Sequence, residues 1–269
     1  MRPAALAFDA AASTFDARFG QWQSVLAQRT AVRESLIKIF PPGGTILEIG
    51  GGTGEDAVWL AQRGFKVLST DAAPAMVETA RRKLAPLGSY AEVIAAEDLE
   101  RFSSRFIDAT RHRFDGAFSN FAGLNCVDDL RPVARGLARL LRPGAAAVLV
   151  LFGKFSPGEI VVECLRRRPR QALRRFRRGA VPASIGGHDF TVRYHEPGTV
   201  TLAMHPWFTL TVRAGIGIFV PPSAAEPWIS QHPEFLELLC RLDRIATQPL
   251  APLGDHVLYQ FVRTEIAAP

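Results

Sequence analysis

Short apolar runs alternate with longer amphipathic stretches over the first 152 residues. Apolar residues gather at 45–49, 65–71, 91–95, 114–120 and 145–152, and runs of this length are typical of buried strands. Residues 56–63 and 129–141 have helical spacing, and Gly64 and the turn Arg142-Pro143-Gly144 follow them. Strands that alternate with helices at this spacing predict an α/β fold, a doubly wound parallel sheet.

The flanking segments have other patterns. Residues 8–40 predict one amphipathic helix that ends at Pro41-Pro42, and residues 157–178 a helix pair or a kinked helix broken at Pro169. In the latter segment we expect a buried apolar stripe of Leu165, Ala172, Leu173 and Phe176. A strand is expected at 188–195 and a short helix at 197–205. Two further strands, 208–219 and 254–264, enclose a helix at 226–246.

These patterns divide the chain into four parts. We expect an N-terminal helical cap at 1–40, a ligand-binding core at 41–152, a lid insertion at 153–206, and a C-terminal part of the core sheet with an inserted helix at 207–269. The insertion is too short to fold as an independent domain. We therefore expect it to cover the carboxyl ends of the strands.

Composition indicates a soluble globular protein. Apolar residues make up 48% and charged residues 22% of the chain. Three cysteines far apart, Cys126, Cys164 and Cys240, predict neither a disulfide framework nor a metal site. No run approaches the roughly 20 apolar residues of a membrane span, and Asp9 comes too early for a signal peptide. We therefore expect a cytoplasmic protein without a transmembrane segment.

The net charge of +6 has a local origin. Eight arginines lie between Arg166 and Arg178 with no acid among them, and the remainder of the chain has a net charge of 6 − 8 = −2. A solvated helix face, a docking surface for an anionic partner such as a carrier protein or a membrane, and an RNA-binding tract all fit such a run. The RNA interpretation lacks the stacking aromatics of a single-strand groove.

The candidate chemistry begins in the glycine-rich stretch that follows the first strand. Residues 48–54 read Glu-Ile-Gly-Gly-Gly-Thr-Gly, and glycines allow positive φ and a close approach of the backbone to a ligand. This spacing is neither the G-x-G-x-x-G of dinucleotide sites nor a G-x-x-x-x-G-K-[ST] phosphate loop. A strand ending in such a loop predicts a nucleotide site at the sheet crevice.

The stretch resembles motif I, E/D-x-G-x-G-x-G, of class I S-adenosylmethionine (SAM)-dependent methyltransferases. The resemblance extends over residues 8–152 and implies a Rossmann-like seven-stranded sheet with an antiparallel final strand. SAM is then the cofactor and S-adenosylhomocysteine the product. Asp71 ends the second strand about 20 residues after the loop, where an acid accepts from the ribose hydroxyls.

The resemblance also implies the other cofactor contacts. Met76 lies beneath the adenine, Asp98 or its neighbour Glu97 accepts from the adenine amino group, Phe15 covers the cofactor, and Arg29 reaches the methionine carboxylate. The predicted cofactor residues are Phe15, Arg29, Glu48, Gly50, Gly51, Gly52, Gly54, Asp71, Ala72, Met76, Glu97, Asp98, Asn120 and Phe121.

The sequence defines the residues around the methyl acceptor less clearly than those around the cofactor. His188 and His195 are the leading catalytic candidates because the lid contributes to acceptor pockets in the family; Tyr194, His205 and His256 are further candidates. Residues 119–122 lack the N-P-P-[YF] of DNA amino-methyltransferases, which disfavours DNA. We expect a small-molecule acceptor, with oxygen slightly favoured over nitrogen or carbon. A non-catalytic SAM-binding scaffold and an RNA methyltransferase are the alternatives, and the chain is expected to be a monomer or a homodimer.

Overall fold

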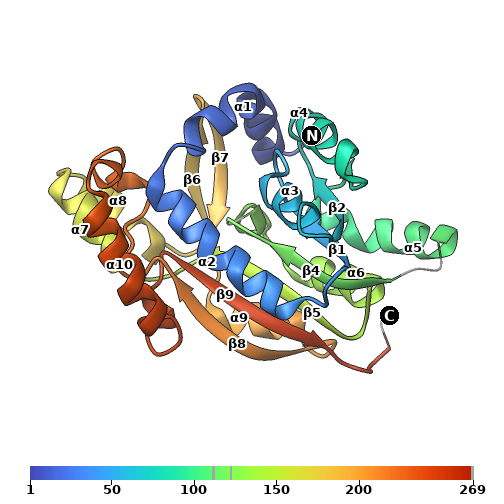
Figure 1. Cartoon of the computed structure of the whole chain (residues 1–269). Coiled ribbons are helices and arrows are strands. Elements are labelled where there is room, and N and C mark those ends of the chain that lie inside the picture. Colours follow the sequence, from blue (N-terminus) through green and yellow to red (C-terminus); the bar gives the residue numbers. More distant parts are fainter. Residues whose placement is uncertain (111–112, 122, 268–269) are drawn as a thin grey trace.

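The computed structural model describes residues 1–110, 113–121 and 123–267, and it contains a seven-stranded sheet in the order β3-β2-β1-β4-β5-β9-β8 (Figure 1). Neighbouring strands from β3 to β5 are parallel, whereas β9 runs antiparallel to both β5 and β8. The predicted doubly wound sheet with an antiparallel final strand is confirmed. The strands are β1 (Thr45–Ile49), β2 (Lys66–Asp71), β3 (Tyr90–Val93), β4 (Phe114–Ser119), β5 (Leu141–Phe152), β8 (Phe208–Ile216) and β9 (His256–Arg263).

Helices cover both faces of the sheet because successive strand side chains point to opposite faces. On β5, Val148 and Val150 pack with α2, α3 and α4, whereas Leu149 and Leu151 pack with α6 and α9. Two buried cores result. The helices of these two layers are α2 (Gln23–Ile39), α3 (Glu55–Ala61), α4 (Pro74–Leu84), α5 (Leu99–Thr110), α6 (Arg131–Leu140) and α9 (Pro197–Met204).

Three predicted elements differ in detail. The single helix expected at 8–40 is two helices, α1 (Pro3–Phe19) and α2, since the chain leaves helical geometry at Gly20-Gln21-Trp22. The helix expected at 226–246 begins at Pro233 (α10, Pro233–Ala246), because proline fits the first turn and interrupts a helix interior. A strand at Ala180–Ile185 (β6) was not predicted; it pairs with β7 (His188–Arg193) through the turn Gly186-Gly187.

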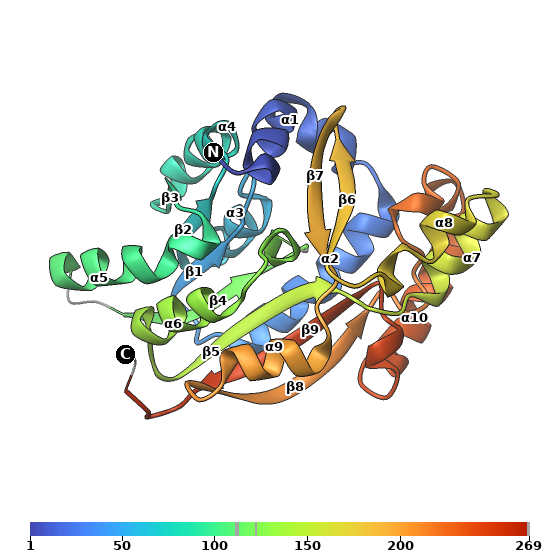
Figure 2. The same cartoon turned by 180° about the vertical axis from the view of Figure 1, so that it is seen from behind.

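The arginine-rich segment forms α7 (Pro157–Leu165), the one-turn helix α8 (Pro169–Ala172) and a 3₁₀ turn, Arg174–Phe176. The expected buried stripe was wrong: Ala172 is buried, whereas Leu165, Leu173 and Phe176 are exposed and Arg175 is buried instead. A helix of one turn is too short to present a continuous stripe, and buried carboxylates stabilise Arg175. Figures 1 and 2 place α7 and α8 at the end of the molecule opposite α5.

The hairpin β6–β7 stands beside α1 above the sheet in both views (Figures 1 and 2). Phe8 of α1 contacts Phe190 of β7, with ring centroids 5.4 Å apart, and Ala7 and Ala11 pack against Ile185 of β6. α1 and the hairpin therefore form one covering layer, built from chain segments more than 160 residues apart. In the part of the chain that the structure describes, no helix is long and apolar enough to cross a bilayer.

Candidate active site

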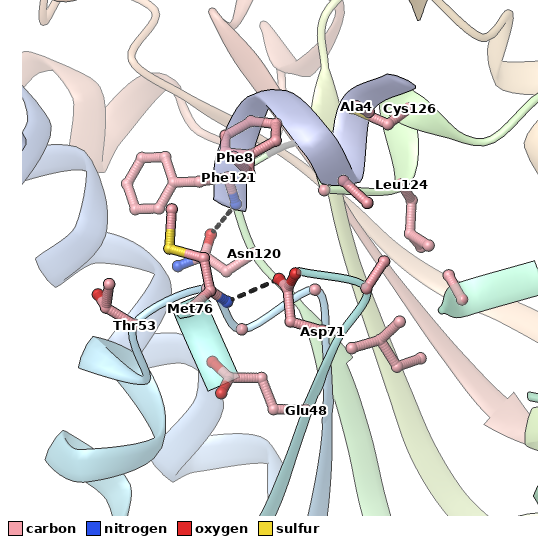
Figure 3. A pocket seen from close by; sticks show the side chains of 18 of the residues that line it. Ala4, Phe8, Glu48, Thr53, Asp71, Met76, Asn120, Phe121, Leu124 and Cys126 are labelled. Carbon is pink, nitrogen blue, oxygen red and sulfur yellow. Dashed lines mark hydrogen bonds between the residues drawn. The ribbon is translucent and has the colours of Figure 1, made fainter. Parts of the chain in front are cut away.

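A pocket opens at the carboxyl ends of β1, β2 and β4, beneath α1 (Figure 3). Two acids, Glu48 and Asp71, lie on the side facing the sheet, and Phe8 lies on the side of α1. The predicted cofactor residues line this pocket with two exceptions, Gly54 and Asp98. The sequence therefore located the pocket, and the fold brings its scattered residues together.

The glycine loop needs space as well as conformational freedom. A Cβ on Gly51 would overlap the Ser69 hydroxyl and the Glu48 carboxylate, and Gly52 has a φ of 56°. Asp71 holds this loop: one carboxylate oxygen accepts from the Gly52 N–H and the other from the Ala73 N–H, each at 2.9 Å. Asp71 thus joins the glycine loop to the start of α4.

Glu48 is a buried acid on the floor of the pocket. Burial, reinforced by the nearby negative charge of Asp56, raises the pKa of Glu48 to about 8. The Ser69 hydroxyl donates to its carboxyl group at 2.5 Å. Without a bound cation, Glu48 is thus protonated at neutral pH.

A polar cluster around Asp56 forms one end of the pocket. The Asp56 carboxylate accepts from Arg33 Nε at 2.6 Å and from Asn120 Nδ2 at 2.8 Å. Arg29 Nε lies 3.8 Å from the same carboxylate and is buried without a hydrogen-bond partner among the described residues. A buried guanidinium with an unused donor fits an anionic group of a ligand, such as a carboxylate.

Phe121 has a strained backbone, with a φ of 48°. For an aromatic residue the left-handed region costs roughly 1–2 kcal/mol, and such strain clusters at functional sites. Asn120 Oδ1 accepts the Phe121 N–H at 2.8 Å, and the Arg29 guanidinium lies 4.9 Å from the ring centroid. The surrounding groups hold the Phe121 ring at the pocket wall.

Acidic residues of α1 fasten this helix over the pocket. Asp9 accepts the Ala75 N–H at 2.6 Å, which caps the first turn of α4. Asp16 accepts from the Thr53 hydroxyl at 2.5 Å and from Lys83 Nζ at 2.6 Å. In the pairs Phe8-Asp9 and Phe15-Asp16, the aromatic rings therefore line the pocket and the acids attach the helix to the loop and to α4.

The two predicted catalytic histidines do not line this pocket. His188 is exposed at the start of β7, beside the hairpin turn. His195 is buried, its Nε2 lies 3.1 Å from the Val127 carbonyl oxygen, and burial lowers its pKa. Their catalytic roles stay predictions.

His256, the first residue of β9, is buried behind the residues that line the pocket and lies opposite the carboxyl end of β5. It pairs with Phe152, and its ring stacks on Phe152 at 4.9 Å and meets the Phe121 ring edge-on at 5.5 Å. Its Nδ1 lies 3.2 Å from both Gln28 Oε1 and Asp255 Oδ2. Both neighbours accept hydrogen bonds, so Nδ1 carries the proton and Nε2 is the acceptor nitrogen of the ring.

Asp255 belongs to a buried ion cluster. Arg175 Nη2 donates to Asp255 Oδ1 at 2.5 Å, and Arg175 Nε donates to Glu159 Oε2 at 2.6 Å. Although burial opposes it, the Arg175 charge, together with His256, holds the pKa of Asp255 well below its usual range. One arginine of the basic run thus orients the carboxylate that orients His256.

Sequence reasoning missed several of these residues. Asp56, Arg33 and Gln28 carry no local motif, and their roles depend on helices α2 and α3 meeting at the pocket. Nothing in the sequence pattern distinguished Arg175 from the seven other arginines of the run. The available signal was the pair Asp255-His256 at the start of the last strand.

Comparisons with known proteins agree with this geometry. Residues 46–144 match the model of the family described as "Methyltransferase domain". The chain is 36% identical over 113 residues to an S-adenosyl-L-methionine-dependent Diels-Alderase iccD of Talaromyces variabilis, an alignment that covers 41% of this chain and 37% of that protein. It is 28% identical over 206 residues to a malonyl-[acyl-carrier protein] O-methyltransferase of Halorhodospira halophila, covering 72% of this chain and 66% of the relative.

The chain thus spans less than two thirds of the length of these curated relatives. Among solved structures, a putative S-adenosylmethionine-dependent methyltransferase of Listeria monocytogenes superposes with a TM-score of 0.55 at 17% identity. That alignment covers 86% of this chain and 97% of the other. At this identity the likeness concerns the fold.

Proposed function

We propose that this chain is a class I SAM-dependent methyltransferase that transfers the methyl group of SAM to a small-molecule acceptor; the match of residues 46–144 to a methyltransferase domain and the similar fold of the Listeria protein support this. The observation that carries the proposal is the charge arrangement of the pocket. Arg29 has an unused buried donor at one end, and Asp71 lies at the other. Such a pocket matches the methionine carboxylate and the ribose hydroxyls of SAM.

The donors and acceptors of the pocket fit this cofactor. Arg29 would bind the carboxylate, Asp71 the ribose hydroxyls, Met76 and Ala72 the adenine ring, and Glu97 the adenine amino group. When bound, SAM supplies an electrophilic methyl group on a sulfonium. The chain itself then has to orient both partners and exclude water. The rings of Phe8, Phe15 and Phe121 would exclude water from the pocket.

An acceptor hydroxyl has to lose a proton, and we propose His256 as the base because its ring contacts Phe121, which lines the pocket. Its Nε2 would take the proton while Nδ1 donates to Asp255 and Gln28, which stabilises the imidazolium. Arg175 fixes Asp255 in turn. This arrangement favours an oxygen acceptor, with His195 and His188 as the other candidates for the base.

The test uses SAM with a labelled methyl group, incubated with the protein and a cell extract that is then separated into metabolite, protein and RNA fractions. We expect label in the metabolite fraction, and much less label with Asp71→Ala at a SAM concentration near the wild-type Kd. Label confined to RNA, or SAM binding with no label in any fraction, would contradict the proposal. The second outcome matters because one relative is named a Diels-Alderase.

The identified acceptor then tests the base. His256→Gln keeps the ring position polar but removes the proton acceptor, so we expect kcat to fall by about 10²–10⁴-fold with SAM affinity unchanged. His195→Gln and His188→Gln are the matched comparisons. A loss of kcat confined to His256→Gln would support the assignment, and an unchanged kcat would exclude it.

A further inference from the structure

The arginine run leaves a surface that the pocket does not use. Six of its arginines are exposed: Arg166, Arg167, Arg168, Arg170, Arg177 and Arg178. Arg175 is excluded from this surface because it is buried against Glu159 and Asp255, and Arg174 donates to Glu159 at 2.7 Å. Arg166 lies 3.9 Å from Glu163 and donates to the Glu226 carbonyl oxygen at 3.5 Å, so the exposed positive charge of the run rests mainly on the other five arginines.

Exposed apolar side chains lie among these arginines. Leu165 is 79% exposed, Val161 57%, Leu173 56% and Phe176 47%. Val161 and Leu165 belong to α7, Leu173 follows α8, and Phe176 ends the 3₁₀ turn, so these side chains lie along the same segment as the arginines. We call this surface of residues 161–178 the α7–α8 face. Figures 1 and 2 show α7 and α8 at the extremity of the molecule.

A groove adjoins the face on the side of the β6–β7 hairpin. Its lining contains five arginines, namely Arg18, Arg167, Arg168, Arg170 and Arg174, together with the acids Glu163 and Asp189. Five arginines against two acids leave the lining with an excess of positive charge. Guanidinium groups bind phosphate bidentately and are only weakly hydrated.

From the two observations together we propose that the α7–α8 face binds the surface of an anionic phospholipid bilayer. The arginines would contact lipid phosphates, and Leu165, Leu173 and Phe176 would enter the boundary between headgroups and acyl chains. An acidic protein would need an apolar patch that matches these side chains, whereas a bilayer offers both chemistries over its whole area. RNA offers phosphates but no partner for exposed aliphatic side chains.

Cosedimentation of the full chain with vesicles tests the proposal. We expect binding to vesicles of mixed phosphatidylcholine and phosphatidylglycerol, no binding to pure phosphatidylcholine, and weaker binding at high salt. Each arginine near such a surface contributes roughly a factor of five. The variant Arg167→Gln, Arg168→Gln, Arg170→Gln, Arg178→Gln should therefore bind about a hundredfold more weakly or worse.

A matched variant controls for net charge. Arg82→Gln, Arg101→Gln, Arg105→Gln, Arg244→Gln removes four exposed arginines outside the face, and its vesicle binding should change by less than about threefold. A third variant, Leu165→Ser, Leu173→Ser, Phe176→Ser, should lose about tenfold or more, because insertion of apolar side chains contributes separately. All three should bind SAM as the wild type does, which separates this face from the cofactor pocket.

Several results would overturn the proposal. The first is the absence of binding to phosphatidylglycerol vesicles. The second is a loss of vesicle binding in the control variant equal to that of the arginine variant of the face, which would indicate an effect of net charge alone. A third is unchanged binding after the three serine substitutions, and a fourth is stronger binding to an acidic carrier protein or to RNA than to vesicles.

Discussion

Arg175→Gln is the substitution with the clearest expected effect on stability. The Arg175 side chain is buried and donates to the Glu159 carboxylate, to the Asp255 carboxylate and to the carbonyl oxygens of Gly153 and Asp255. Glutamine removes the charge and leaves two buried carboxylates without their cation. Breaking a buried ion pair in this way costs about 3–5 kcal/mol.

The expected shift in melting temperature follows from the chain length. An unfolding entropy of about 2.1 cal/mol/K per residue gives about 0.56 kcal/mol/K for 269 residues. The loss therefore corresponds to a Tm lower by about 5–9 °C. Calorimetry at neutral pH measures it, and Arg178→Gln, an exposed arginine of the same run, should stay within about 1 °C of the wild type.

The stability difference measured at acidic pH provides a second test of Arg175→Gln. Because the pKa of Asp255 is held below its usual range, this carboxylate stabilises the fold above the unfolded pKa of 3.8, and the contribution is lost as the pH falls below that value. The difference between Arg175→Gln and wild type should therefore shrink in acid. A Tm for Arg175→Gln within about 2 °C of the wild type at neutral pH would refute the reasoning.

Two more predictions concern the pocket. Asp71→Ala should weaken SAM binding by about 1.5–3 kcal/mol in titration calorimetry. Asp98→Ala removes an exposed ion pair with Arg2 and should have little effect on SAM binding. An equal loss of SAM affinity in the two variants would place Asp98 in the site. For Glu48, the folded pKa of about 8 lies above the unfolded value of 4.5, so wild-type stability should fall as pH rises between these values, at up to about 1.4 kcal/mol per pH unit. Glu48→Gln should lose this slope in Tm measured from about pH 5 to 8, and parallel curves for the two proteins would show that Glu48 is not its origin.

Local sequence determined the central part of this protein. The strands of residues 41–152 and the glycine loop were predictable because apolar periodicity, glycine and proline act through the neighbouring backbone. Most of the cofactor residues expected from the resemblance to the methyltransferase family line the pocket, and that family's motifs lie in the same stretch. Of the hairpin β6–β7, only the second strand was predicted from the sequence. The turn Gly186-Gly187 precedes that strand, and Pro182 weakens the strand pattern of β6.

Tertiary structure decided the roles of residues without a local motif. Arg175 lies in the same run as Arg174 and Arg177, yet it is buried because Glu159 of α7 and Asp255, just before β9, meet at its position. His256 is oriented by Gln28, 228 residues away. Leu165, Leu173 and Phe176 are exposed although their types predict burial. Burial and charge pairing depend on which distant segments meet, and a single stretch of sequence does not contain that information.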